Sequence, residues 1–367
     1  MAKLHLVIAD SDESYVESLI SYLTDSYPQK FQVSYFTKED YLVKHLSDTS
    51  KKVDILLVGP ELSEYIPKDK INTMIILSDG RLPEKYRSCA MVNKYQTGDK
   101  LVSSILNIFS ERNADEVYIQ SSNKPTRVIG VYSPTGGTGK TSIAIGSAMQ
   151  SALRDMPVFY LNLENAQSTP LFFDCKGEQN LSHIFYFLKE KSKNINLKIE
   201  GVRIVDPKYN IHYFAPPESV LEFEEISPDE LQYLINQLKE LGCYDVIFID
   251  MSSNFDNRNL AVLQACDEIF LVLTQDDISG IKLKTLISEM DIASPKSNAN
   301  LNDKLTLIIN KFNPMGPTQI EGLDILGKPI SLRIPKVSSL LTRQSDKYVI
   351  NLNNNFGEAL KGLVNKY

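Results

Sequence analysis

The chain has 367 residues, 43% of them hydrophobic, which is long and apolar enough for two or three domains with cores of their own. Its net charge is −7 and it contains no run of basic residues, so we expect no nucleic acid among its partners. No segment approaches the roughly 20 apolar residues of a transmembrane helix, and the N-terminus turns acidic too early for a signal peptide. We therefore expect a cytoplasmic protein without stable membrane insertion.

The first third of the chain alternates short apolar runs with helical patterns. The apolar runs, which we predict to be strands, are residues 4–9, 32–36, 53–58, 73–77 and 89–92. Helical patterns follow the first, second and last of these runs. Strands and helices that alternate at this length indicate a doubly wound parallel sheet. We place this first domain at residues 1–112.

The strand ends of this domain resemble those of the receiver domain of two-component signalling. Asp10 follows the first strand, Ser78 the fourth and Lys94 the fifth, as in a receiver. The aspartate that a receiver phosphorylates would end the third strand, but Gly59 stands there. The resemblance implies a flavodoxin-like, receiver-like domain that has lost its phospho-acceptor and serves protein contacts. The three polar residues either form a residual ligand site or are the polar groups that the strand ends of any such sheet carry.

A polar stretch separates this domain from the next. Residues 113–126 end in Ser-Ser-Asn-Lys-Pro-Thr, and Pro125 disfavours helix at the residue before it. We therefore predict a linker at residues 113–126 and a second domain at residues 127–367. The apolar residues 117–119 inside the linker are expected to pack on one domain as a short extended segment.

The second domain opens on a strand, a glycine-rich loop and a helix. Residues 128–132 form a short apolar run that is typical of a central parallel strand. The glycines of the loop let backbone N–H groups face an anion, and the helix points its positive end at the same place. The lysine can reach phosphate oxygens and the threonine hydroxyl can bind Mg²⁺. The predicted phosphate-binding residues are Gly136, Gly137, Thr138, Gly139, Lys140, Thr141 and Ser142. The alternative is a glycine-rich connection in an ordinary α/β domain.

This loop departs from the common pattern G-x-x-x-x-G-K-[ST], because Pro134 stands where the first glycine belongs. What remains, GGTGKTS, resembles the deviant phosphate loop of the MinD/ParA class of P-loop ATPases. In that class the first lysine of the loop reaches across a dimer to the nucleotide of the partner. Thr135 occupies that position here. The resemblance implies a homodimer that binds ATP and Mg²⁺ in an α/β domain, without the charge that crosses the dimer.

Two further strand ends complete the predicted site. Residues 244–250, YDVIFID, form a central strand that ends in Asp250, a carboxylate placed to hold Mg²⁺ with Thr141. The segment MSSNFD after it is expected to sense the γ-phosphate. The strand at residues 158–161 is followed by Asn162 and Glu164, where the class carries two carboxylates. An asparagine cannot act as a base, so either Glu164 substitutes as a weak catalytic candidate beside Lys140, or hydrolysis is slow.

The remainder of the second domain is predicted in less detail. Residues 181–188 and 228–241 are expected to be helical, and residues 202–205 and 211–214 to be paired short strands. The resemblance implies that Asn310, after the strand at 305–309, bonds the adenine edge, and that Pro335 lies near a second wall of the base pocket. Asn310 can equally be a turn residue at a strand end. The last helix carries an apolar stripe that either packs on the sheet or binds a membrane, as in some relatives: Phe356, Leu360, Leu363 and Val364.

A receiver-like domain without its acceptor, followed by a deviant P-loop ATPase domain, resembles the TadZ/CpaE family. The resemblance implies an ATP–Mg²⁺-binding, dimerising factor that localises and assembles Flp-type (tight adherence) pili at a cell pole. Its partners would be pilus-assembly or polar proteins. Pro134, Thr135 and Asn162 depart from the pattern of the class, so we expect a weak ATPase at most.

Two alternatives stay open. The first is a ParA-like partitioning or MinD-like division-site ATPase, which predicts binding to DNA or anionic lipid that weakens with salt. The second is an enzyme on the same fold. A reductase of this kind needs cysteines for a bridging cluster, whereas the four cysteines here are scattered and we expect them to be reduced and mostly buried. A tyrosine kinase of this kind usually has a tyrosine-rich tail, whereas this tail has only Tyr348 and Tyr367.

Overall fold

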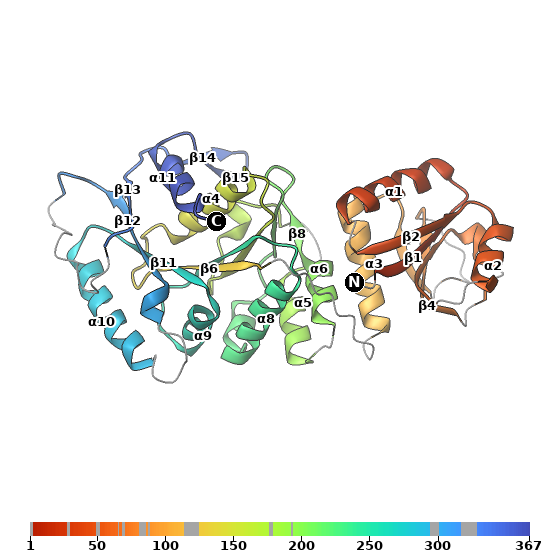
Figure 1. The fold of residues 1–367 in the computed structure, drawn as a ribbon, viewed down its shortest axis with the longest axis horizontal. Coiled ribbons are helices and arrows are strands. Elements are labelled where there is room, and N and C mark those ends of the chain that lie inside the picture. The colour runs from red at the N-terminus through yellow and green to blue at the C-terminus, as the bar shows by residue number, and fades with distance from the viewer. Residues whose placement is uncertain are drawn as a thin grey trace. The chain divides into compact units, whose positions relative to one another are not determined.

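The structure is a computed structural model. It describes residues 3–27, 30–48, 52–64, 66–67, 70–80, 86, 89–113, 125–175, 179–191, 194–293, 301–316 and 329–367. The chain divides into two compact units, residues 1–120 with 192–202 and residues 121–191 with 203–367, and each is built on its own sheet (Figure 1). Most of the predicted linker, including the segment 117–119, lies outside the described residues, so its structure stays a prediction.

The first unit is a five-stranded parallel sheet in the order β2-β1-β3-β4-β5. This is the flavodoxin-like order of a doubly wound fold, and it confirms the predicted fold class. Each predicted strand is present, with bounds that differ by at most two residues from the apolar runs. The elements are β1 (Leu4–Ala9), α1 (Glu13–Ser26), β2 (Phe31–Phe36), α2 (Glu39–Asp48), β3 (Val53–Val58), η1 (Pro60–Leu62), β4 (Ile71–Ser78), β5 (Ala90–Asn93) and α3 (Gly98–Arg112).

Side chains of β1 alternate between the two faces of this sheet. Leu6 and Ile8 join a buried cluster with α1 and α3, whereas Val7 and Ala9 join another with α2. The alternation follows from the two-residue period of a strand. Because helices cover both faces, the strand is apolar at every position except His5 rather than alternating between apolar and polar residues. Asp12 caps the first turn of α1 and so fixes where the helix begins.

The second unit is an eight-stranded sheet in the order β13-β12-β11-β6-β10-β7-β9-β8, parallel throughout except for β8, which runs antiparallel to β9. Its strands are β6 (Arg127–Tyr132), β7 (Val158–Leu163), β8 (Ile204–Val205), β9 (Ile211–Tyr213), β10 (Val246–Met251), β11 (Glu268–Leu273), β12 (Leu305–Phe312) and β13 (Leu332–Pro335), with a separate hairpin of β14 (Leu341–Gln344) and β15 (Lys347–Ile350). Its helices are α4 (Lys140–Ala152), η4 (Thr169–Leu171), α5 (Leu181–Lys189), α7 (Val220–Glu224), α8 (Pro228–Glu240), α9 (Asn257–Ala265), α10 (Asp277–Ala293), η6 (Leu301–Lys304) and α11 (Asn355–Val364).

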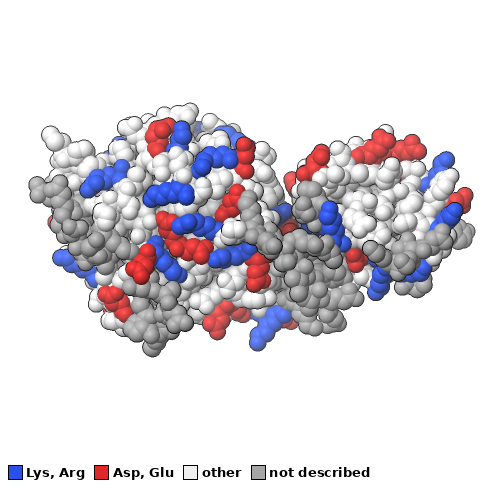
Figure 2. Space-filling view, in the orientation of Figure 1, with Lys and Arg blue, Asp and Glu red and all other residues white. Residues whose placement is uncertain are grey.

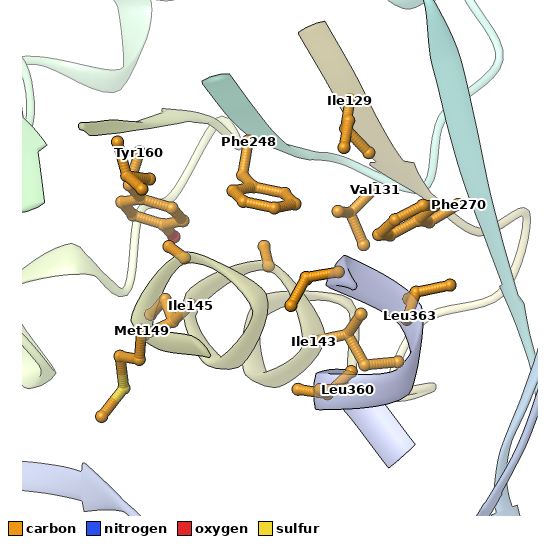
Figure 3. Close-up of a cluster of buried hydrophobic side chains, with 14 of the residues drawn as sticks. Ile129, Val131, Ile143, Ile145, Met149, Tyr160, Phe248, Phe270, Leu360 and Leu363 are labelled. Atoms are coloured by element: carbon orange, nitrogen blue, oxygen red, sulfur yellow. The ribbon is translucent and has the colours of Figure 1, made fainter. Parts of the chain in front are cut away.

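Helices α4 and α11 cover one face of this sheet, and α8 and α9 cover the other (Figure 1). Figure 3 shows side chains of α4 and α11, Ile143 and Leu360 among them, meeting strand residues such as Val131 and Phe248 in one cluster. The apolar stripe of α11 is buried in this cluster, which confirms that the last helix packs on the sheet. No helix of the described ranges is long and apolar enough to span a membrane.

Residues 195–202 form a helix, although a strand was expected to begin at Val202. This helix, α6 (Ile195–Val202), packs on α3 and places Leu197 in the core of the first unit. The expectation was wrong at Val202 because Ile195, Ile199 and Val202 lie four and three residues apart, the spacing of one helical face. The pairing expected after it is confirmed, since β8 and β9 are hydrogen-bonded neighbours.

The expectation of mostly buried thiols was wrong. All four cysteines are free, and Cys266 is buried, but Cys243 is exposed and Cys89 and Cys175 are half-buried. Cys243 follows the glycine turn between α8 and β10, where the chain crosses the surface. Burial raises the pKa of the Cys175 thiol to about 11, so this thiol is a poor nucleophile.

Candidate functional site

The glycine-rich loop joins the central strand β6 to α4. Gly137 and Gly139 have φ angles of 73° and 94°, in the left-handed region that favours glycine. At Gly139 a Cβ would lie 2.4 Å from Nδ2 of Asn310, so a larger residue does not fit there. The backbone N–H of Thr135 donates to the hydroxyl of Ser133 at 3.1 Å, which tightens the first turn of the loop. The loop therefore needs glycine at two of its three predicted glycine positions.

Lys140, the first residue of α4, is 7% exposed and lies across the loop. Its Nζ donates to the hydroxyl of Ser253 at 2.8 Å. Ser253 belongs to the MSSNFD segment, which the sequence predicts to sense the γ-phosphate. Sequence reasoning identified that segment but not the individual serine, because nothing local distinguishes Ser253 from Ser252.

Asp250 is fully buried near the end of β10. Its Oδ2 accepts a hydrogen bond from the Tyr160 hydroxyl at 3.0 Å, whereas Oδ1 has no hydrogen-bond partner among the described residues. Burial, followed by the charge of Glu164, raises the pKa of Asp250, and the Thr141 hydroxyl acts in the opposite direction. Sequence reasoning missed Tyr160, although its place on the neighbouring strand, two residues before Asn162, was a usable signal.

The donor set around Asp250 fits Mg²⁺. Asp250 Oδ1 has no hydrogen-bond partner in the described part of the chain, and the Thr141 hydroxyl lies near enough to lower the pKa of both Asp250 and Glu164. Mg²⁺ prefers oxygen ligands and keeps several waters, so one carboxylate and one hydroxyl suffice when phosphates supply the rest. The described residues contain no group of three or more His, Cys, Asp or Glu side chains that would hold a metal by itself. A Mg²⁺ ion here would therefore depend on a bound phosphate.

Asn162 is buried and its side chain is already occupied. Its Nδ2 donates to the Tyr160 hydroxyl at 3.2 Å, and its Oδ1 accepts from the backbone N–H of Glu164 at 2.8 Å. Burial raises the pKa of Glu164, while Lys140, Asn162 and Thr141 act in the opposite direction. The structure thus brings Glu164 together with the loop residues Lys140 and Thr141, and it uses Asn162 as a structural link.

The end of β12 contacts the loop from the other side of β6. Asn310 is 4% exposed, and its Nδ2 donates to the carbonyl of Thr138 at 2.7 Å. Lys311 donates from Nζ to the carbonyl of Gly137, also at 2.7 Å. Sequence reasoning missed Lys311, although it directly follows Asn310. Pro335 ends β13 opposite Phe312 of β12, so it lies beside this strand end, and Ser142 lies in the first turn of α4.

A cavity of about 870 Å³ lies at the opposite edge of the same sheet, where β6 begins. Several of its charged and polar lining residues are paired within the protein. Arg127 pairs with Glu268 at 2.9 Å and lies over the ring of Tyr367, whose hydroxyl donates to Glu268 at 2.7 Å. The phosphate-loop edge differs, because the buried oxygens Thr135 Oγ1 and Thr138 Oγ1 have no hydrogen-bond partner among the residues that the structure describes. Buried polar atoms are normally paired, so the loop edge is the better candidate site.

No protein-family model matches the chain, and no curated protein matches it. Among solved structures, a ParA family ATPase from Chlorobium tepidum TLS is 20% identical, with a TM-score of 0.55 over 66% of this chain and 98% of that chain. A putative plasmid partition protein from Borrelia burgdorferi B31, bound to AMPPNP, is 21% identical, with a TM-score of 0.51 over 66% and 98%. These similarities show that the chain contains the α/β fold of the ParA-type P-loop ATPases.

Proposed function

We propose that the second unit binds ATP with Mg²⁺ and that the bound nucleotide controls homodimerisation. The observation that carries the proposal is a set of buried oxygens around the loop that lack partners in the described part of the chain: Asp250 Oδ1, Thr135 Oγ1 and Thr138 Oγ1. An unsatisfied buried polar atom costs about 1–3 kcal/mol, and a phosphate–Mg²⁺ complex would satisfy these three together. The plasmid partition protein of the same fold binds AMPPNP, an ATP analogue, which supports the assignment.

The order of the strands supports one orientation of the nucleotide. β10, which carries Asp250, and β7, which Glu164 follows, lie on one side of β6, and β11 and β12 lie on the other. Ligands of open α/β sheets bind beyond the carboxyl ends of the strands. The γ-phosphate and Mg²⁺ would therefore lie towards β10, and the base towards β12, Asn310 and Pro335.

Slow hydrolysis is part of the proposal. The side chain of Asn162 is bonded to the Tyr160 hydroxyl and to the backbone N–H of Glu164, and it supplies no carboxylate. Glu164 retains a carboxylate beside Lys140 and is the candidate base. Slow hydrolysis keeps ATP bound for a long time, which suits a protein whose homodimerisation depends on the bound nucleotide.

At the level of biological role, we propose a cytoplasmic localisation and assembly factor for Flp-type pili, concentrated at a cell pole through pilus-assembly or polar partners. The support is the combination of a flavodoxin-like first unit, in which Gly59 replaces the phospho-acceptor, with a ParA-type second unit. Within the first unit Lys94 pairs with Asp10 at 3.3 Å, so the residues that a receiver uses for phosphoryl transfer are engaged with each other. A role in protein contact fits this arrangement.

A ParA- or MinD-like partitioning or positioning ATPase is supported about equally, because the similar structures include a ParA family ATPase and a partition protein. The two roles differ in their partners. On the face drawn in Figure 2, Lys and Arg side chains interleave with Asp and Glu over the second unit, and the net charge is −7. Binding of DNA or anionic vesicles that is lost as salt is raised would favour the partitioning role.

The test of ATP binding compares wild-type protein with Lys140→Ala and with Lys361→Ala, an exposed lysine of α11, as the matched control. A labelled ATP analogue gives the affinity, and light scattering gives the mass without nucleotide, with ADP and with ATP. We expect Lys140→Ala to lose at least ~100-fold in affinity and to stay monomeric, since the lysine contacts the β- and γ-phosphates.

Three outcomes would each overturn a part of the proposal. Wild-type protein that binds no ATP removes the binding claim. Nucleotide-free and Lys140→Ala proteins that form the same dimer as ATP-loaded protein remove the switch. Rapid steady-state turnover would contradict the slow hydrolysis and favour an enzyme on the same fold.

A further inference from the structure

The strand β12 is irregular where it meets the phosphate loop. Its register with β13 shifts between Ile309 and Phe312, which marks a β-bulge, and Lys311 has a φ of 57°. A left-handed backbone is uncommon for lysine and is held only when the surroundings enforce it. Bulges of this kind re-aim side chains next to functional sites.

The bulge changes where two consecutive side chains point. In a regular strand, neighbours point to opposite faces of the sheet. Here Asn310 and Lys311 both reach the same loop and donate to two consecutive carbonyls, those of Thr138 and Gly137, at 2.7 Å each. The loop and Asn310 approach so closely that only glycine fits at Gly139.

Holding a carbonyl also orients the N–H that follows it. In a planar trans peptide the C=O and the next N–H point in opposite directions. With the Gly137 carbonyl turned to Lys311, the N–H of Thr138 faces away from β12. With the Thr138 carbonyl turned to Asn310, the N–H of Gly139 does the same. Two consecutive donors are thereby aimed into the loop, as in backbone anion sites.

We propose that Asn310 and Lys311 are positioning residues that preset the phosphate loop for the pyrophosphate group of a nucleoside di- or triphosphate. This inference rests on the proposed function, namely that the loop binds phosphates. Lys311 also brings a positive charge from the same subunit to a loop that carries Thr135 where related loops carry lysine. Lys311 is exposed and its ammonium contacts Gly137, and an added Cβ at Gly136 or Gly137 would meet open space.

The proposal differs from a contact between Asn310 and adenine in one measurable way. A residue that acts through the loop affects every ligand with a pyrophosphate group, with or without a base. A residue that contacts only the base affects ATP but leaves inorganic pyrophosphate unchanged. Binding of ATP and of pyrophosphate, each with Mg²⁺, therefore separates the two roles.

The experiment measures both affinities for the full-length protein and for Lys311→Met, Lys311→Arg and Asn310→Ala, with Lys361→Met as the matched control. Lys311→Met is expected to weaken ATP and pyrophosphate by the same factor, about tenfold, because it removes a charge-assisted hydrogen bond. Lys311→Arg should restore most of the loss, and the melting temperature without ligand should not change. Asn310→Ala should also weaken both ligands equally. Because Asn310 is buried, the exposed Lys311 keeps the test decisive if Asn310→Ala fails to fold.

Two results would overturn the inference. One is wild-type affinity of Lys311→Met for both ligands. The other is a loss confined to ATP, which assigns the strand end to the base. Failure of the underlying function has a different signature, since wild-type and Lys140→Ala proteins would then bind ATP equally poorly.

Discussion

Each unit has a buried aspartate at the carboxyl end of one parallel strand, Asp10 after β1 and Asp250 near the end of β10. The two carboxylates differ in whether their oxygens have partners within the protein. In the first unit Asp10 is 2% exposed and its two oxygens lie 3.3 and 3.4 Å from Nζ of Lys94, while Oδ1 also accepts from the N–H of Asp12. In the second unit Asp250 is fully buried, and Oδ1 accepts no hydrogen bond from any residue that the structure describes. The carboxylate of Asp10 is therefore paired within its unit, whereas one oxygen of Asp250 has no hydrogen-bond partner among the described residues.

The difference shows that two units with similar parallel sheets need not both bind a ligand at the carboxyl ends of their strands. At the edge of the first unit, Gly59 stands where an acceptor carboxylate would lie, and an added Cβ would be 3.1 Å from Oδ2 of Asp10. Lys94 is paired with Asp10 at 3.3 Å, and Asp12 lies 3.9 Å from the same nitrogen. At the edge of the second unit, Lys140 is bonded to Ser253 rather than to Asp250, so charge of both signs stays available to a ligand.

The sharpest way to break this comparison is to neutralise each aspartate. Asp250→Asn is expected to weaken Mg²⁺-dependent ATP binding by about 100-fold, or ~2.7 kcal/mol, because it removes the charged metal ligand. Asp10→Asn is the matched control and should leave ATP affinity unchanged. Titration of ATP with and without Mg²⁺ measures both. Equal effects of the two substitutions would mean that the edges do not differ as proposed.

Restoring a carboxylate at the second edge should raise turnover. Asn162→Asp keeps the acceptor for the N–H of Glu164 and adds a base where the MinD/ParA class carries one. We expect steady-state hydrolysis to rise by about tenfold or more, since a well-positioned general base typically contributes about 10²–10⁴-fold. Asn353→Asp, at an exposed position before α11, is the control. An unchanged rate would show that Asn162 does not limit hydrolysis.

Removing the cation of the first edge should affect stability and leave nucleotide binding alone. Lys94→Met leaves Asp10 buried without its partner, at a cost of about 1–3 kcal/mol to the first unit. Hydrogen exchange of the amides of β1 and β5 would localise the loss, and ATP affinity gives the second readout. A fall in ATP affinity without a change in exchange would contradict the assignment of Lys94 to a structural pair.

The smallest predicted effect is a pH dependence of stability that we expect in the second unit but not in the first. Burial, followed by the charge of Arg203, holds the pKa of His212 well below its usual value of 6.5, and the imidazole contacts the Tyr244 hydroxyl at 2.9 Å. In the unfolded chain His212 binds a proton as the pH falls through 6.5, whereas in the folded unit it stays neutral. The free energy of unfolding therefore has its full value above pH 6.5 and decreases below it. Between pH 6.5 and 5.5 the second unit should lose about 1 kcal/mol.

His212→Gln should remove this pH dependence, and denaturant unfolding at a series of pH values measures it. The unfolding transition of the first unit is the internal reference, because His212 belongs to the second. A dependence that persists in His212→Gln would assign the titration to another group.

The sequence predicted most of the elements and the core of the site. Apolar runs located the strands because strands buried on both faces need predominantly apolar sequence, as β1 and β10 have apart from His5 and Asp250. The order Gly137, Gly139 and Lys140 predicted the phosphate loop because two of these positions require left-handed backbone. The helix α6 was missed in part, since a strand and a helix both accept a short apolar segment such as that around Val202.

Local sequence patterns could not predict the side-chain hydrogen bonds around the site. Tyr160 meets Asp250 across 90 residues of sequence, Lys140 meets Ser253 across 113, and Lys311 meets Gly137 across 174. Each of these bonds depends on which strands become neighbours, and strand order is not encoded by periodicity. The contacts of Asn162 and Asn310 within the protein are of the same kind.

The sequence by itself determined which residue types stand in the glycine-rich loop and at the strand ends, and residue type and local backbone preference are sufficient to predict a phosphate loop there. Only the resemblance to receivers and to the MinD/ParA class marked Gly59 and Asn162 as positions without a carboxylate. Only the tertiary structure decided which of these groups are satisfied and which are not. A polar group has a partner only when the fold brings a second group within hydrogen-bonding distance. The first unit places Lys94 beside Asp10, whereas the second unit leaves one oxygen of Asp250 without a hydrogen-bond partner among its described residues.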